Sequence, residues 1–308
     1  MLASLDSAVR PLEPLRVSFG GDVKSPVFIQ TPWLAGSRME DLFDRTTRLP
    51  ASDGIALYRS EGLLIGHAYE PFVAAELAAR SESLYRRILA AAQGRHLYRV
   101  WNYVPQINAE TGGFENYRAF SAGRAQAFEA VQGCDFPARL PAASAVGCEG
   151  SRLDAIFIAG ETAPTHFENP EQIPAYQYPP EHGPRSPSFA RATVADDGSR
   201  RWTFISGTAA IKGHQTIAAG DLAAQLDCTL DNLRLISQAT GLGENLAAGR
   251  ASRRHFKVYL RHPGDLAAAQ ARLARDFFRP TDEVTYLHAA ICRAALAVEI
   301  EATLVTGR

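Results

Sequence analysis

The stretch VTYLHAAICRAALAVEIEATLV, residues 284–305, decides the fold. Two apolar runs rich in β-branched residues flank a short link at residues 293–295, a pattern that predicts two strands joined as a β-hairpin. The second run alternates apolar residues with Glu299, Glu301 and Thr303, so both carboxylates share one face of a strand that we expect to be central. Like charges about 7 Å apart along a strand, together with burial, raise carboxyl pKa values. We therefore expect at least one glutamate to stay protonated near neutral pH, as a general acid must.

Composition excludes several classes of protein. The 308 residues are enough for two domains, and 32 basic against 33 acidic residues leave a net charge of -1 that gives no sign of a nucleic-acid partner. No run reaches the roughly 18 apolar residues of a membrane span. The opening residues 1–17 lack the apolar core of a signal peptide, so we expect a cytoplasmic protein without membrane association. The four cysteines are widely spaced without a CxxC pair, so neither a zinc site nor a disulfide framework is expected.

The expected elements recur in the same order in both halves of the chain: strand, helix, strand, helix, strand, strand. We infer an α+β protein of two domains, each a mixed sheet with two helices packed on one face. The expected segments are 54–70 (hairpin), 72–93 (helix), 96–104 (strand), 117–132 (helix), 143–148 and 153–159 (closing strand pair), then 202–211 (strand), 221–240 (helix), 254–260 (strand), 264–278 (helix) and 284–305 (closing hairpin).

The segment between the two halves has a different character. Residues 162–191 are dense in Pro, Tyr, His and Arg. A plain linker is the alternative, but linkers seldom carry so many aromatic and cationic side chains, and prolines reduce the entropy lost when a loop is ordered over a pocket. We therefore divide the chain into an N-terminal domain at 1–160, a connecting loop at 161–200 that contributes to the site, and a C-terminal catalytic domain at 201–308.

Four stretches of the chain carry a family resemblance. They read LYRVWNYVPQINAETGGFENYRAFSAGRAQAFEA (97–130), AYQYPPEHGPRSPSFARA (175–192), FISGTAAIKGH (204–214) and YLHAAICRAALAVEIEATL (286–304). In this order they resemble the chorismatases, enzymes that split chorismate into pyruvate and a ring product. The C-terminal half, with SGTA and VEIEA, also resembles the RidA fold of small imine deaminases. The resemblance therefore implies two RidA-like, chorismate-mutase-like α/β sandwich domains.

The resemblance implies a site that needs no cofactor and no metal ion, built for the two carboxylates and the enolpyruvyl ether of chorismate. Glu299, the first glutamate of VEIEA, would be the catalytic acid that protonates the enol methylene, and Glu301 would pair with a cation. The alternative for a strand glutamate is a solvated or salt-bridged role, which is the more common one. The residues expected to bind the substrate are Tyr103, Tyr117, Arg124, Tyr178, Arg191, Gly207 and Cys292.

Each residue type suits a different part of the substrate. An arginine binds a carboxylate in a bidentate fork, and Arg124 and Arg191 lie inside the matching stretches beside apolar neighbours. Tyrosines can wall the ring and donate hydrogen bonds, and Gly207, in an expected turn, would let backbone N–H groups approach an oxyanion. Arg293 is a weaker candidate, because at the hairpin link its simplest partner is solvent. Also weaker, or left without a role, are Arg118, Arg185, His166, His182 and His214.

Cys292 bears on the product. Chorismatases differ in whether water hydrolyses the ether, giving a dihydroxycyclohexadiene carboxylate, or a ring hydroxyl participates, giving 3-hydroxybenzoate. The second group carries a cysteine seven residues before the catalytic glutamate, which is the spacing of Cys292 and Glu299 here. The chain most resembles the bifunctional type that makes both 3- and 4-hydroxybenzoate for an aryl polyene pigment and for ubiquinone.

Three alternatives stay open. A chorismate hydrolase would release pyruvate together with 3,4-dihydroxycyclohexa-1,5-diene carboxylate. A RidA-like imine deaminase would use the same glutamate with an arginine at the start of the preceding strand, where Tyr286 and Leu287 stand instead. A ligand-binding module would keep the arginine and tyrosine pocket without needing an acid. A monomer and a homotrimer both fit the resemblance.

Overall fold

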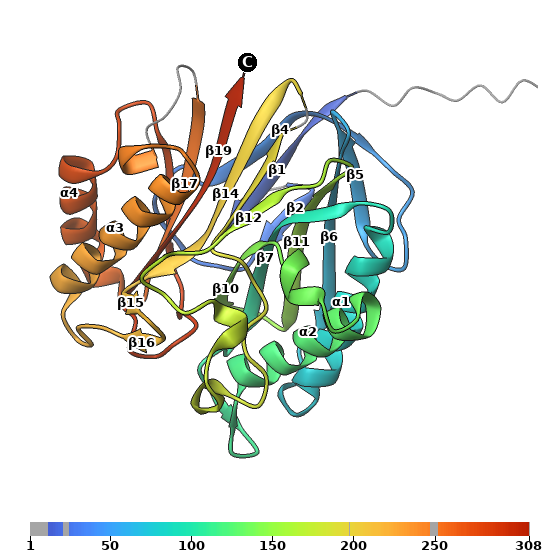
Figure 1. Ribbon diagram of the computed structural model, residues 1–308, viewed down its shortest axis with the longest axis horizontal. Coiled ribbons are helices and arrows are strands. Elements are labelled where there is room, and N and C mark those ends of the chain that lie inside the picture. The colour runs from blue at the N-terminus through green and yellow to red at the C-terminus, as the bar shows by residue number, and fades with distance from the viewer. Residues whose placement is uncertain (1–11, 21–24, 197, 247–251, 308) are drawn as a thin grey trace, which may run out of the picture.

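Two sheets pack face to face in the computed structural model, which describes residues 12–20, 25–196, 198–246 and 252–307. A pair of helices covers the outer face of each sheet, so the layers run helix, sheet, sheet, helix (Figure 1). This architecture confirms the predicted α+β fold class. Residues 1–11, part of the segment expected to lack a signal peptide, lie outside the described residues. Within the described ranges, no helix is both long and apolar enough to cross a bilayer.

The strands are β1 (Glu13–Phe19), β2 (Val27–Ile29), β3 (Trp33–Gly36), β4 (Met39–Arg48), β5 (Ala56–Ser60), β6 (Leu63–Pro71), β7 (His96–Pro105), β8 (Glu110–Thr111), β9 (Phe114–Glu115), β10 (Ala142–Cys148), β11 (Arg152–Gly160), β12 (Thr165–Phe167), β13 (Ala192–Asp196), β14 (Arg200–Ala209), β15 (Ile211–Lys212), β16 (Gln215–Thr216), β17 (Ser252–Leu260), β18 (Glu283–His288) and β19 (Val298–Gly307). The α-helices are α1 (Leu77–Ala91), α2 (Asn116–Gln132), α3 (Leu222–Ala239) and α4 (Leu266–Asp276).

The strand order of the sheets confirms the internal repeat. The first sheet runs β10-β7-β11-β6-β5-β4-β1-β2, and the second runs β12-β13-β14-β19-β17-β18-β3. The series β6-α1-β7-α2-β10-β11 therefore has the same succession and the same strand neighbours as β14-α3-β17-α4-β18-β19. As predicted, β19 is central, because it pairs antiparallel with both β14 and β17.

The predicted hairpin at residues 284–305 is wrong. β18 and β19 are not neighbours, because β17 lies between them, parallel to β18 and antiparallel to β19. The predicted pairing of the two strands that close the first half is wrong for the same reason, because β7 lies between β10 and β11. Apolar alternation detects a strand but not its partner, and a parallel partner comes from far along the chain. The hairpin at residues 54–70 is confirmed as β5 and β6, which turn at Glu61 and Gly62.

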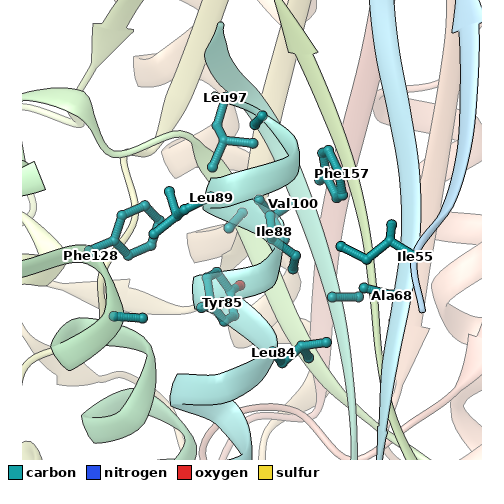
Figure 2. Packing of buried hydrophobic residues seen from close by; sticks show 14 of the residues in the cluster. Ile55, Ala68, Leu84, Tyr85, Ile88, Leu89, Leu97, Val100, Phe128 and Phe157 are labelled. Atoms are coloured by element: carbon teal, nitrogen blue, oxygen red, sulfur yellow. The ribbon is translucent and has the colours of Figure 1, made fainter. Parts of the chain in front are cut away.

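The helices of the first half pack on the sheet through one apolar stripe. Leu84 and Ile88 of α1 lie a turn apart and are fully buried against the sheet and α2 (Figure 2). Burial of such a side chain contributes about 1.5–3 kcal/mol to stability. Gly123 lets α2 approach α1 closely, since a Cβ there would lie 1.9 Å from the carbonyl oxygen of Ala78. The helix predicted at 72–93 begins later, at Leu77, after a 3-10 turn.

The segments at both ends of the first half also join the second sheet. β3 pairs with β18, so a strand from the N-terminal part of the chain completes the edge of the C-terminal sheet. β12 and β13, from the connecting segment, form its other edge. The boundaries predicted at 160 and 200 remain a prediction about independently folding units.

Candidate active site

A bulge in β14 makes room for the carboxyl of Glu299. The register between β14 and β19 shifts between Ile205 and Thr208, which sets Gly207 opposite the glutamate side chain. A Cβ at Gly207 would lie 2.1 Å from Glu299 Oε1, far inside the contact distance. The expected turn at Gly207 is therefore wrong: the residue lies inside a strand, and its missing side chain admits the acid.

Glu299 has the properties of a protonated acid. Only 3% of the residue is exposed, and within the described part of the chain Oε1 has no hydrogen-bond partner. Burial, followed by the negative charge of Glu301, raises the pKa of the Glu299 carboxyl to about 8, against the opposing effect of Arg99 and Arg191. Near neutral pH this carboxyl therefore holds a proton that it can donate.

Glu301 titrates in the opposite direction, although it lies on the same strand face and is equally buried. Its carboxylate accepts hydrogen bonds from Arg99 Nη2 at 2.7 Å and Trp101 Nε1 at 2.8 Å, and Lys257 Nζ lies 2.9 Å away. Burial alone would raise the pKa of Glu301, but Lys257 and Arg99 outweigh it and lower that pKa. The expected pairing of Glu301 with a cation is confirmed. The expectation that the two glutamates raise each other's pKa holds for Glu299 only.

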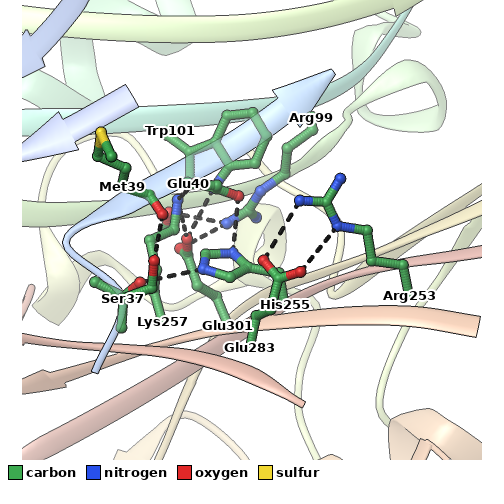
Figure 3. A network of polar contacts seen from close by, with 12 residues as sticks. Ser37, Met39, Glu40, Arg99, Trp101, Arg253, His255, Lys257, Glu283 and Glu301 are labelled. Atoms are coloured by element: carbon green, nitrogen blue, oxygen red, sulfur yellow. Dashed lines mark hydrogen bonds and ion pairs between the residues drawn. The ribbon is translucent and has the colours of Figure 1, made fainter. Parts of the chain in front are cut away.

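The cations around Glu301 belong to a buried network between the sheets. Lys257 Nζ also lies 2.7 Å from Glu40 Oε2, and His255 Nδ1 lies 3.0 Å from Glu40 Oε1 (Figure 3). The charged residues come from β4, β7, β17 and β19, so the network joins β19 to the first sheet. Glu301 is thereby fixed as a negative charge behind Glu299.

Glu299 opens into a cavity of about 440 Å³ between the repeat units. This volume is in the range of small-ligand sites. Six of the eight residues predicted from the sequence line it: Tyr117, Tyr178, Arg191, Gly207, Cys292 and Glu299. The other lining residues are Glu115, Arg118, Glu181, His182, Pro187, Phe189, Ala209, Ile211, Gln215, Thr216, Arg293, Ala294 and Ala295. Six of the 19 lining residues come from the connecting segment, which therefore contributes to the cavity wall.

Arg191 is the buried cation of the cavity. Its Nη2 donates a hydrogen bond to Tyr178 Oη at 2.7 Å, and its guanidinium lies 5.1 Å from the ring centroid of Phe189. Glu168 Oε2 lies 3.8 Å from Nε, and burial raises the pKa of that carboxyl to about 7. Near neutral pH Glu168 is therefore protonated in about half of the molecules, and in these the positive charge of Arg191 is available to an anionic ligand.

Cys292 contributes a neutral thiol. Burial, and then the adjacent Glu299, raise the pKa of the Cys292 thiol to about 12. A thiol of that pKa is almost entirely protonated at neutral pH, so it is a poor nucleophile. At neutral pH Cys292 therefore adds an uncharged, weakly polar surface to the cavity wall. Burial likewise raises the pKa of Tyr117 well above its ordinary value, so its hydroxyl stays a hydrogen-bond donor.

Arg293 is a stronger candidate for ligand binding than its sequence position indicates. Its Nη1 donates to the carbonyl oxygen of His214 at 2.7 Å and to Thr216 Oγ1 at 3.3 Å, and its guanidinium lies 5.2 Å from the ring centroid of Tyr178. The expected solvent-facing position is wrong, because the residue is half-buried in the cavity wall. The mistaken hairpin concealed it, since a long connection between β18 and β19 leaves Arg293 room to fold inward.

Two predicted residues do not line the cavity. Tyr103 is 1% exposed in the core between the two sheets, where burial raises the pKa of its hydroxyl. Arg124, on α2, is 3% exposed and stacks over the rings of Tyr85 and Phe128 at 4.9 and 5.7 Å. Arg185 forms an ion pair with Glu129 at 2.7 Å and lies outside the lining.

Among the described residues, one group of side chains has the composition and closeness to hold a metal ion: Glu181, His182 and His214. The sequence reading found no ligand spacing among these histidines, because they come from segments more than 30 residues apart that the fold brings together. His166, the third unassigned histidine, contacts Thr193 Oγ1 at 3.0 Å instead.

Comparisons with known proteins identify the family. Residues 43–159 match the family described as "Chorismatase FkbO/Hyg5-like, N-terminal". A chorismatase of Streptomyces rapamycinicus is 39% identical over 262 residues, which are 81% of this chain and 76% of that protein. A 3-hydroxybenzoate synthase of Streptomyces hygroscopicus is 39% identical over 218 residues, 67% of this chain but only 62% of that protein.

A solved structure agrees over the whole described fold. A crystal structure of a chorismatase superposes with a TM-score of 0.78 at 28% identity, covering 98% of this chain and 95% of that one. The fold and these relatives show that the chain is an enzyme. The chain belongs to the chorismatase family.

Proposed function

We propose that this protein is a chorismatase that converts chorismate to pyruvate and 3-hydroxybenzoate, 4-hydroxybenzoate or both. The observation that carries the proposal is the buried carboxyl of Glu299, which lines the same cavity as Arg191 and Arg293 and whose pKa burial raises to about 8. Chorismate offers two carboxylates to the arginines and an electron-rich enol ether to the acid.

The acid starts the reaction. Glu299 transfers its proton to the methylene carbon of the enolpyruvyl group, so a C–H bond forms and the former enol carbon becomes an oxocarbenium-like centre. Water that adds to this centre gives a hemiketal, which collapses with cleavage of its bond to the ring oxygen and releases pyruvate and the diene acid. If the ring hydroxyl adds instead, the ring loses the proton at the ether carbon and the C–O bond of that hydroxyl breaks, so the ring becomes aromatic and the ketal collapses to pyruvate and hydroxybenzoate. The negative charge of Glu301, held by Arg99 and Lys257, keeps Glu299 protonated before the transfer.

The neutral thiol of Cys292 supports an aromatic product. It lies in the same cavity as Glu299, close enough that the ionised form of that carboxyl raises the pKa of the thiol. A neutral, weakly polar thiol beside the acid offers a water molecule little hydrogen bonding, which favours addition of the ring hydroxyl over addition of water. The name of one relative, a 3-hydroxybenzoate synthase, agrees with this product.

The test is to incubate the purified protein with chorismate and no added cofactor, to follow pyruvate with a coupled lactate dehydrogenase assay, and to separate the ring products by chromatography. Pyruvate with 3-hydroxybenzoate, with or without the 4-isomer, is the expected result. Pyruvate with a non-aromatic diene acid would keep the chorismatase activity and overturn the role of Cys292. No pyruvate from folded protein would overturn the proposal and direct the search to imine substrates.

A further inference from the structure

Three potential ligand atoms converge at one wall of the cavity. His182 Nε2 lies 2.9 Å from His214 Nδ1, and Glu181 Oε1 lies 3.5 Å from the first nitrogen and 3.3 Å from the second. These atoms form a nearly equilateral triangle. His182 and His214 are half-buried, while Glu181 is exposed.

Protons alone do not satisfy this triangle. Each imidazole nitrogen either carries one hydrogen or presents one lone pair, and an ionised carboxylate presents lone pairs only. If His182 donates to His214, the accepting nitrogen turns its lone pair toward that bond and offers no proton to Glu181. If both histidines donate to Glu181, two N–H groups face each other across 2.9 Å. Every such arrangement therefore leaves one edge of the triangle without a hydrogen bond, whereas a cation at the centre would be a partner for all three atoms.

The dimensions of the triangle suit a tetrahedral metal ion. Zinc bonds to imidazole nitrogen and carboxylate oxygen are about 2.0–2.2 Å long, and this length places two ligands of one tetrahedron about 3.3 Å apart. The three observed separations, 2.9, 3.3 and 3.5 Å, lie around that value. We propose that Glu181, His182 and His214 form a binding site for a divalent transition-metal ion, with zinc as the best fit.

The surrounding contacts hold the two ligand segments together before any ion binds. Gln172 Nε2 donates to the carbonyl oxygen of Ile211 at 2.8 Å, and the backbone of Gly213 bonds to Glu171 and Ile173 at 2.8 and 3.0 Å. The ring of Tyr178 lies 5.1 Å from that of His182. These contacts fix the backbone of the segment before His214 and place an aromatic ring beside His182, which lowers the entropy lost when an ion binds.

An ion bound by these three residues would have a free coordination site facing the cavity. Two of the ligands, Glu181 and His182, line the cavity, and the carbonyl oxygen of the third accepts a hydrogen bond from Arg293. Three protein ligands leave the fourth position of a tetrahedron to water or to a carboxylate. The site is separate from the acid, and it does not rest on the proposed activity.

The experiment is metal binding by the complete protein without substrate. Metal-free protein is titrated with Zn²⁺ in competition with a chromophoric chelator, and separately with Co²⁺, whose visible spectrum reports tetrahedral coordination. We expect one ion per chain and a tetrahedral Co²⁺ spectrum. The variants His182→Ala and His214→Ala should each bind at least about 100-fold more weakly, in line with the loss of one of three ligands.

Two further variants keep the test decisive. Glu181→Gln changes only an exposed side chain, so it will fold, and it should weaken Zn²⁺ binding at least about tenfold. His96→Ala removes an exposed histidine outside the triangle and should leave the affinity unchanged. Absence of stoichiometric binding, an octahedral Co²⁺ spectrum, or equal losses in His96→Ala and His214→Ala would each overturn the proposal.

Discussion

Glu299 and Glu301 project from the same face of β19, and their carboxyls have opposite pKa shifts. Both are almost fully buried, yet among the residues that the structure describes, cations contact Glu301, from Arg99 and Lys257, and not Glu299. The fold therefore uses one glutamate as a fixed charge and leaves the other protonated beside it. Two identical side chains have different roles because their partners come from different strands.

Replacing Glu299 with glutamine should abolish most of the turnover. The variant keeps the size of the side chain and loses the transferable proton, so we expect kcat for pyruvate release from chorismate to fall by about 10²–10⁴-fold. Affinity for the substrate, measured by calorimetry, should change little, because Arg191 and Arg293 remain. A variant that keeps wild-type turnover would show that Glu299 is not the acid.

The pH dependence of turnover should report the pKa of Glu299. An acid works in its protonated form, so kcat should fall as the pH rises through about 8. In Glu301→Gln the neighbouring negative charge is gone while Arg99 and Lys257 remain, which lowers the pKa of Glu299. The falling limb should then move to lower pH, as steady-state measurements across the neutral and alkaline range will show.

Asp154→Asn is the matched control for that substitution. Asp154 is a buried carboxylate that contacts His67 at 2.8 Å and lies outside the cavity lining. Breaking either buried pair should cost roughly 3 kcal/mol of unfolding free energy, measured by urea denaturation. Only Glu301→Gln should shift the pH limb. Equal shifts in both variants would mean that general destabilisation, and not the local charge, sets the profile.

Gly207→Ala should impair catalysis through the position of the acid. A Cβ at this site would lie 2.1 Å from Glu299 Oε1, so the carboxyl must move. Misplacing a catalytic group by about 1 Å costs on the order of 10²-fold in rate, and kcat should fall by that amount. Gly264→Ala is the control, since a Cβ there meets nothing within 4 Å. Unchanged turnover in Gly207→Ala would contradict the close approach.

Cys292→Ala should change the products more than the rate. The acid is untouched, so pyruvate release should stay within about tenfold of wild type. The added space beside Glu299 admits water, and the share of the diene acid should rise at the expense of hydroxybenzoate in the chromatogram. Cys134→Ala, an exposed cysteine outside the lining, serves as the control. An unchanged product ratio would remove Cys292 from the control of product.

The sequence was sufficient for the elements and for the side-chain faces of β19, because alternation along a strand is a local property. Strand partners were not local: β17 enters between β18 and β19 from more than 20 residues earlier. The same limit applies to the site. Tyr103 and Arg124 lie in the stretches that resemble the chorismatases. A position inside such a stretch can face the protein core as well as the cavity, and the sequence alone does not distinguish the two.

The network around Glu301 could not be predicted either. Its members, Glu40, Arg99, Lys257 and Glu301, are spread over 262 positions of the chain, and each looks like an ordinary charge in its own segment. Burial turns these charges into obligatory partners, because an unpaired one would be strongly destabilising. Only the packing of the two sheets reveals that requirement.

The place of β19 has a consequence for synthesis on the ribosome. β14 and β17 are both synthesised before β19. Until β19 emerges, the backbone groups on the edge that each of them will pair with β19 have no strand partner. A nascent chain that ends before residue 298 has its second sheet in two pieces, β12-β13-β14 and β17-β18-β3. The strand that joins them is also the one that carries Glu299, so sheet closure and catalytic competence arrive in a single step. Chains that end before β19 therefore lack the glutamate and have two strand edges without a partner, a feature that favours aggregation.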